Sequence, residues 1–538
     1  MRGLLASSIG VTCAAALALP LTPPATAATA RPAPTTEAAT AAVRATSPTA
    51  PLPGSTQSLP LTPLARDRAL GAGQGVPRRD VRPFSLLGVV WDDPDAELHG
   101  RVQVRTRATG TGTWSGWQDL ETHNADHSAD PGSSERASDQ VRGATAPLWV
   151  GDSDGVEVRV TPTAGTHTED TAHDAHTVPT ATPLPSGLRL ELVDPGEADA
   201  EAAAPGELDP EAAAPEAAVP GEADAEAAAP GEAVTEAAVP GESDPQAAAP
   251  GELDPAAAAP DPAPVAPPRG RAVTARGPAG SGAAAAMTAE AAAASAANLD
   301  LAPLGAVAVP ALDRTGTERE LLALRGAELT DGQRAKPYIG PRPGIVTRRG
   351  WGADEKLREK GFRYTTKVKA AFVHHTASGN NYKCSQVPSI IRSIYRYHVR
   401  SMGWRDIGYN FLVDKCGKIY EGRAGGVTKP VLGAHTLGFN SNSMGIAVIG
   451  TFSSTKPPSS AVTAIARLTA WKLGLFGANP RGKTYLKSGG GNLYAKGKNV
   501  RLNVISGHRD GFATECPGRQ LYGKLGSARS SAARYQGR

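Results

Sequence analysis

Residues 368–376 read VKAAFVHHT, an apolar run that ends in two histidines and a threonine. A short apolar run rich in β-branched and aromatic residues predicts a buried strand. Side chains alternate across a strand, so His374 and His375 are expected to face opposite sides of the sheet. One imidazole is therefore presented on each face.

The segments that follow this strand alternate between helix and strand patterns. Apolar residues recur at helical spacing in two of them, and short apolar runs bounded by turn residues occur in the others. The order β, α, β, β, β, α, β predicts a mixed α/β domain with helices packed on a central sheet. The expected elements are a helix over 387–398, strands over 409–413, 419–421 and 444–450, a helix over 462–473 and a strand over 504–506.

The N-terminus has the pattern of a secretory signal peptide. Arg2 gives a positive start, a short apolar run covers 4–19, and small-residue cleavage patterns follow at 25–30. The apolar run is too short to span a membrane comfortably, which favours a cleaved signal peptide. A non-cleaved membrane anchor is the alternative. We expect residues 1–30 to be removed and the mature protein to be exported, with no integral membrane span.

Composition divides the rest of the chain. With 60 Gly and 46 Pro, much of the length is not expected to be packed core. Alternating runs within 81–185 predict a β-rich module, best described as a small β-sandwich. Pro-Gly-Glu triplets that recur mostly every ten residues from Pro195 onward cannot build a long helix or bury a core. The expected divisions are 31–80 disordered, 81–185 β-rich accessory module, 186–335 acidic repeat linker, 341–525 folded domain and 526–538 basic tail.

Charge is strongly segregated although the whole chain carries only +3. Residues 191–260 contain 18 Asp or Glu and no Lys or Arg, whereas 341–538 contain 33 Lys or Arg and 8 Asp or Glu. Such a basic domain favours an anionic partner. Because the leader indicates export, we expect anionic cell-wall polymers rather than nucleic acid. The acidic stretch could also fold back on the basic domain.

Removal of the leader leaves three cysteines, which is an odd count for an exported protein. Metal ligation explains a cysteine that has no disulfide partner. A hydrolytic zinc site takes three protein ligands from His, Cys and carboxylate and keeps a fourth position for water. His374, His508 and Cys516 form such a set. A protonated structural cysteine, or mixed pairing of Cys516 with Cys384 or Cys416, is the alternative.

Five blocks of sequence, in order over roughly 345–525, resemble the peptidoglycan recognition protein and type 2 amidase family. An RGWGA block at 349–353 also fits the bacterial branch. The five blocks are FVHHTA at 372–377, GWRDIGYNFLV at 403–413 with GKIYEGR at 417–423, GAHT at 433–436, GHRD at 507–510 and TECPG at 514–518.

The resemblance implies a zinc enzyme that cleaves the amide between the lactyl group of N-acetylmuramic acid and L-alanine in peptidoglycan. The expected zinc ligands are His374, His508 and Cys516, with Tyr409 at the catalytic tyrosine position and Thr514 at a position held by lysine or threonine. Members that only bind peptidoglycan commonly lack the cysteine, so a non-catalytic recognition module is the alternative. The residues leave the general base open, with Glu515 as a further candidate.

The remaining expectations concern the surroundings of the site. Residues His375, Thr376, His435 and Asn440 are expected to contact substrate. Cys384 and Cys416 are expected to form a disulfide around the first helix, stabilising the fold by roughly 3–4 kcal/mol in the chain-entropy model. We expect a secreted or wall-associated monomer that binds Zn²⁺ and peptidoglycan.

Overall fold

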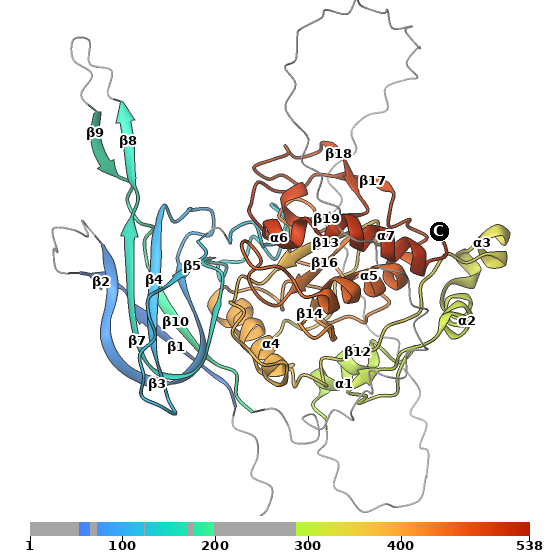
Figure 1. The fold of residues 1–538 in the computed structure, drawn as a ribbon, viewed down its shortest axis with the longest axis horizontal. Helices are drawn as coiled ribbons and strands as arrows, with labels where there is room; N and C mark the ends of the chain where they lie inside the picture. The colour runs from blue at the N-terminus through green and yellow to red at the C-terminus, as the bar shows by residue number, and fades with distance from the viewer. Residues whose placement is uncertain (1–52, 65–72, 123, 169–176, 198–286) are drawn as a thin grey trace, which may run out of the picture. The chain divides into compact units, whose positions relative to one another are not determined.

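The computed structural model describes residues 53–64, 73–122, 124–168, 177–197 and 287–538 (Figure 1). Residues 50–538 form one compact unit by their contacts. The expected signal peptide and the central part of the acidic repeat lie outside the described residues. None of the helices in the described part of the chain combines the length and the apolar character that a membrane crossing needs.

The C-terminal domain is built on a seven-stranded mixed sheet in the order β11-β12-β15-β14-β16-β13-β19. The apolar run that ends in His374 forms β13, which pairs in parallel with β16 on one side and β19 on the other. This confirms the predicted mixed α/β fold. The strands are β11 Ala308–Val309, β12 Ile345–Val346, β13 Ala370–His375, β14 Phe411–Val413, β15 Ile419–Glu421, β16 Ser443–Val448 and β19 Ile505–Gly507.

Strand alternation gives the two faces of this sheet different partners. Leu412, Ala447 and His374 are register partners on β14, β16 and β13, so they share a face. Leu412 and Ala447 pack with the apolar residues of α4 (Val387–Arg396), which continues as a π-helical turn over Tyr397–Ser401. His374 therefore projects from the face of the sheet that α4 also covers.

The opposite face is covered by α5 (Ser459–Gly474) and α7 (Leu525–Tyr535), which pack against each other (Figure 1). The prediction of a basic tail over 526–538 is wrong, because Leu525, Ala528, Ala532 and Ala533 of α7 are buried against the domain. The alanines lie on one side of the helix and let it approach α5 closely. The short helix α6 (Arg519–Tyr522) precedes α7.

The predicted linker is too long at both ends. At its C-terminal end the chain forms α1 (Ala289–Ala296), α2 (Arg314–Arg325) and α3 (Asp331–Ala335). Asn298, directly after α1, donates hydrogen bonds to both carboxylate oxygens of buried Glu421 at 3.0 Å. Composition alone could not separate the Ala-rich helix α1 from the repeat, because Glu421, the partner of the residue that follows it, lies 123 positions away. A hairpin of β17 (Lys483–Lys487) and β18 (Asn499–Asn503) was also not predicted.

The N-terminal module is an antiparallel sheet whose bounds differ from the expected 81–185. It starts at Ser55, inside the segment expected to be disordered, and ends at Asp194, inside the expected linker, because β1 and β10 pair along their whole length. The strands are β1 Ser55–Pro60, β2 Thr62–Pro63, β3 Gln74–Trp91, β4 Gly100–Ala108, β5 Gln118–Leu120, β6 Gly143–Ala144, β7 Leu148–Pro162 and β10 Arg189–Asp194, with a separate hairpin of β8 Ala164–Thr168 and β9 Thr177–Ala181.

These strands do not divide into the two sheets of the predicted sandwich. Hydrogen bonds join the first eight into one sheet, which bends through the long strand β3. Three register irregularities in β3 let its two ends pair with different neighbours, β2 near Gly75 and β6 near Trp91. Both β3 and β10 also contact α4 of the C-terminal domain.

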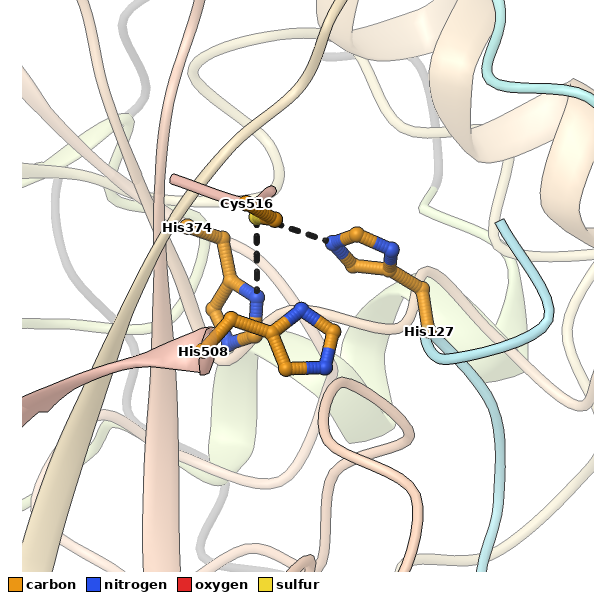
Figure 2. A group of neighbouring side chains, drawn as sticks. All are labelled: His127, His374, His508 and Cys516. Atoms are coloured by element: carbon orange, nitrogen blue, oxygen red, sulfur yellow. Dashed lines mark hydrogen bonds between the residues drawn. The ribbon is translucent and has the colours of Figure 1, made fainter. Parts of the chain in front are cut away.

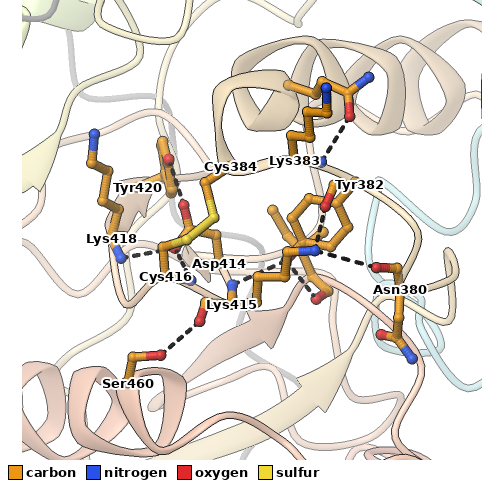
Figure 3. Close-up of a disulfide and its surroundings, with 12 residues drawn as sticks. Asn380, Tyr382, Lys383, Cys384, Asp414, Lys415, Cys416, Lys418, Tyr420 and Ser460 are labelled. Carbon is orange, nitrogen blue, oxygen red and sulfur yellow. Dashed lines mark hydrogen bonds between the residues drawn. A yellow bond between two sulfur atoms is a disulfide. The ribbon is translucent and has the colours of Figure 1, made fainter.

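The predicted disulfide between Cys384 and Cys416 is present (Figure 3). It joins the start of α4 to the turn between β14 and β15. The carboxylate of Asp414 shapes that turn by accepting hydrogen bonds from the backbone N–H groups of Cys416 and Lys418 at 2.9 Å. The disulfide therefore connects the helix that covers the His374 face directly to the sheet.

Candidate metal centre

Two histidines meet at the carboxyl ends of neighbouring parallel strands. His374 lies near the end of β13, and His508 begins the 3₁₀ turn that follows β19. Val373 and Gly507 are register partners, so His374 and His508 follow them at the same end of the two strands. Both imidazoles are fully buried, and their ring centroids are 4.5 Å apart.

Cys516 returns to this edge through the loop after His508. The backbone N–H of Arg509 donates to the carbonyl of Cys516 at 3.0 Å, which closes the loop. The thiol lies 3.8 Å from Nδ1 of His374 and is buried. The three residues predicted as a ligand set are therefore brought together by two strand ends and one closed loop.

A fourth residue, His127, completes the group and comes from the N-terminal module (Figure 2). Its Nε2 lies 3.5 Å from Sγ of Cys516, and its ring centroid lies 4.4 Å from that of His508. Its Nδ1 is hydrogen-bonded to Oδ1 of Asp126 at 2.9 Å. Sequence reasoning missed both residues. The only local signal was a His next to an Asp in a loop without strand pattern, which is common in proteins.

The donor set fits a zinc ion. One ligand atom from each of His127, His374, His508 and Cys516 lies within 4.8 Å of the others. Ligand atoms of a tetrahedral zinc site with bonds of about 2.0–2.3 Å lie about 3.3–3.8 Å apart. Neither ring nitrogen of buried His508 has a hydrogen-bond partner among the described residues. Unpartnered buried nitrogens are costly, and a metal ion would satisfy one of them.

Burial keeps the imidazoles of His374 and His508 neutral, which is the form that binds metals. Burial lowers the pKa of His508 to about 3, and burial with the neighbouring imidazoles lowers the pKa of His374 well below its usual range. Burial opposes ionisation of Asp126, yet the imidazoles of His127 and His508 and the nearby Thr514 hydroxyl hold the pKa of that carboxyl well below its usual range. The site therefore combines the neutral imidazoles of His374 and His508 with one buried carboxylate.

The two predicted catalytic residues border this group. The ring of Tyr409 is buried, with its centroid 5.6 Å from that of His374 and 5.9 Å from that of His127. Thr514 is partly exposed, and its hydroxyl accepts a hydrogen bond from the backbone N–H of Cys516 at 3.2 Å. Both side chains thus lie beside the ligands.

The residues predicted to contact substrate separate into two pairs. His435 stacks edge-on against His374 at 5.3 Å, and Asn440 supports the His435 loop by accepting hydrogen bonds from the backbone N–H groups of His435 and Thr436. His375 points away from the four-residue group, and its Nδ1 accepts a hydrogen bond from the backbone N–H of Phe452. Thr376 hydrogen-bonds to Ser378 and to the N–H of Gly450, so it holds the strand end.

Fold and site together define a mixed-sheet domain with a buried His/Cys centre at one sheet edge. The family described as N-acetylmuramoyl-L-alanine amidase matches residues 364–519. A second family, described as Rv3811 N-terminal galactose-binding domain-like, matches residues 32–183.

Known proteins match about a third of the chain. Peptidoglycan-recognition protein SC2 of Drosophila simulans is 30% identical over 183 residues, which cover 34% of this chain and 84% of that protein. A peptidoglycan recognition protein of Trichoplusia ni is also 30% identical over 183 residues, covering 34% and 85%. The solved structure of wild-type Drosophila PGRP-LB is 27% identical, covers 34% of this chain and 92% of that one, and has a TM-score of 0.27. The chain belongs to the peptidoglycan recognition protein and type 2 amidase family.

Proposed function

We propose that this protein is a secreted, zinc-dependent amidase that cleaves the bond between the lactyl group of N-acetylmuramic acid and L-alanine in peptidoglycan. The observation that carries the proposal is the convergence of His374, His508 and Cys516 at one sheet edge, with neither ring nitrogen of His508 hydrogen-bonded to a described residue. Family members that only bind peptidoglycan commonly lack the cysteine, whereas this chain retains Cys516.

The reaction is a hydrolysis. Water adds to the lactyl carbonyl carbon, the amide C–N bond breaks, and a carboxylate and the free amino group of L-alanine are formed. His374, His508 and Cys516 would hold the zinc ion, which when bound supplies Lewis-acid polarisation of the scissile carbonyl. The carboxyl-end edge of the sheet keeps these side chains on rigid backbone, which fixes where the carbonyl must lie.

Tyr409 and Thr514 have distinct roles in the proposed reaction. Burial raises the pKa of the Tyr409 phenol well above its usual range, so the group stays protonated and can donate a hydrogen bond to the developing oxyanion. Thr514 is neutral and a poor base, and its hydroxyl orients the loop that carries Cys516. The exposed Glu515 next to it is the remaining candidate for proton transfer.

Two properties of the chain support a location at the cell wall. The leader-like residues 1–30 favour export, and the excess of Lys and Arg in 341–538 favours association with anionic wall polymers. We propose that the mature protein works there as a monomer.

The test is release of stem peptides from purified peptidoglycan by the full chain and by its His127→Ala variant. The variant is included because Nε2 of His127 lies 3.5 Å from Sγ of Cys516. Release of peptides with a free L-alanine amino group that requires both zinc and Cys516 supports the amidase. If both chains hold one zinc and bind peptidoglycan but neither releases peptides, the protein is a recognition module.

A further inference from the structure

Residues 124–142 of the N-terminal module form an irregular segment that lies over the candidate metal centre, and we call them the plug segment. Within it, residue 124 and residues 126–129 are buried although the segment contains no regular secondary structure. Asn124, Asp126, His127 and Ser128 are each at most 6% exposed. Asp126, His127 and Ser128 contact His508, Cys516 and Asn440, which the amidase proposal assigns to metal and substrate.

Within the plug segment, His127 is oriented as a metal ligand. Asp126 holds Nδ1 of His127, so the other nitrogen, Nε2, faces Cys516. A carboxylate on the far nitrogen of a ligating histidine fixes the ring orientation and raises its basicity, and it is a common accompaniment of zinc-bound histidine. Asp126 is itself fixed from the other domain, because its carbonyl accepts the N–H of Leu437 at 2.9 Å.

A second set of contacts covers the loop expected to bind substrate. The carboxylate of Asp130 accepts hydrogen bonds from Nδ2 of Asn440 at 2.7 Å and from the N–H of Gly438 at 2.8 Å. Nδ2 of Asn440 also donates to the carbonyl of Ser128 at 2.8 Å. Every side-chain hydrogen-bonding group of Asn440 is therefore occupied, and none is left for a ligand.

A buried ion pair fastens the far end of the plug segment. Arg423 makes a two-pronged contact with Glu135, with N–O distances of 2.9 Å and 2.8 Å, and both side chains are less than 10% exposed. The backbone closes around the same region, because a Cβ on Gly403 would lie 2.0 Å from the carbonyl oxygen of Gln140. The plug segment is thus held along its length rather than at His127 alone.

We infer that His127 is the fourth ligand of a closed zinc centre and that the plug segment holds the chain in a latent state. The inference rests on the proposed amidase function. Catalytic zinc sites keep a coordination position for water or substrate, whereas sites with four protein ligands are structural and closed. Activation requires the His127 imidazole to leave and water to take its position, together with release of Asn440 from Asp130. Peptidoglycan or wall polymers that compete for these contacts would open the site.

The coordination is tested by zinc X-ray absorption on the full chain and two variants. The unmodified protein is expected to show three imidazoles and one sulfur around zinc. His127→Ala is expected to show two imidazoles, one sulfur and one oxygen. His99→Ala is the matched control, because His99 is an exposed histidine of the same module and should leave the spectrum unchanged. Two imidazoles and an oxygen in the unmodified protein would overturn the inference.

The latent state is tested separately with Glu135→Ala, which keeps all four ligands but leaves Arg423 buried without its partner. Loss of one partner of a buried ion pair weakens the state that buries it. We expect faster trypsin cleavage at Arg136 and Arg142, and stem-peptide release at least about tenfold above the unmodified chain for both Glu135→Ala and His127→Ala. His99→Ala should match the unmodified chain in both assays.

The outcomes separate this inference from the proposed function. If the amidase proposal fails, no variant releases stem peptides, yet the number of imidazoles around zinc still reports on His127. If the amidase proposal holds and the latent state does not exist, the unmodified chain is as active as His127→Ala and trypsin cleaves the Glu135→Ala chain no faster.

Discussion

At the scale of single residues, Tyr409 is the group whose role can be isolated from metal binding. Its ring is buried beside His374, but it is not one of the four residues whose ligand atoms converge. Removing only its hydroxyl should therefore leave the ligand set intact.

We expect Tyr409→Phe to retain one zinc per chain and to lose about 10²-fold in turnover, the size of effect seen when one oxyanion donor is removed. The measurement compares zinc content and kcat in the His127→Ala background, where the proposed fourth ligand is missing and water can take its position. Full activity of the double variant would exclude the proposed role.

A second residue-scale property concerns stability rather than catalysis. Glu421 is buried beside Asn298, Arg348 and Glu355, and burial raises its pKa to about 7. This pKa is above the ordinary carboxyl value of 4.5. Between pH 4.5 and 7 the Glu421 carboxyl is therefore protonated in the folded chain and ionised in the unfolded chain. The stability tied to Glu421 is complete below that window and is lost as pH rises through 7.

Glu421→Gln removes this proton linkage and keeps an acceptor for Asn298. We predict that the variant gains stability relative to the unmodified chain between pH 5 and pH 8, by up to roughly 3 kcal/mol. Denaturant unfolding of both proteins at pH 5 and pH 8 gives the difference between their free energies of unfolding. The contributions of all other titrating groups cancel in this difference. A difference that does not change with pH would contradict the prediction.

At the scale of elements, α7 decides whether the C-terminus is part of the fold. The basic composition of 526–538 predicted a tail, but alanines on one side of the helix pack against α5. Small residues allow close helix packing and carry little hydrophobic signal in a sequence, which is why composition failed here.

Two adjacent substitutions distinguish a packed helix from a tail. Ala528 is 1% exposed, so Ala528→Asp buries a charge and should destabilise the domain by several kcal/mol. The neighbouring Ser527 is exposed, and Ser527→Asp should be within about 0.5 kcal/mol of the unmodified chain. Thermal melts of the two variants provide the test, and equal melting temperatures would restore the tail interpretation.

At the scale of the whole molecule, the N-terminal sheet and the C-terminal domain share one apolar core. Leu86 and Val90 of β3 pack in the same cluster as Ile390 and Ile394 of α4. The hydroxyl of Tyr397 donates to the carbonyl of Thr145 at 3.0 Å, directly beside the plug segment. The plug is therefore supported by an extended interface.

Gly88 lies at this interface, where an added Cβ would be 2.3 Å from the hydroxyl oxygen of Tyr397. Gly88→Ala should force the two parts of the core to shift, at a cost of about 1–3 kcal/mol. Hydrogen exchange should become faster in β3, α4 and the plug segment together. Gly110→Ala is the control, because nothing lies within 4 Å of its added Cβ. Unchanged exchange in Gly88→Ala would show that the plug does not depend on this interface.

The sequence by itself determined the C-terminal fold, the disulfide and the three residues that converge from that domain. Each of these has a local signal, such as strand and helix periodicity around 370–507, an odd number of cysteines, or a motif block in order along the chain. Local signals were also enough to find β-rich structure before residue 185. They did not give its ends, because β1 and β10 depend on pairing with each other across more than a hundred residues.

Only the tertiary structure decided that the centre has a fourth candidate ligand and that it is covered. His127 and His374 are separated by 247 positions and an acidic repeat, and nothing in the residues around either one encodes the other. Their approach results from the apolar packing of α4 on β3 and from the buried pair of Glu135 and Arg423. Such contacts form only in the folded chain, between segments that are far apart in the sequence. The periodicity and composition of a single segment therefore cannot predict them.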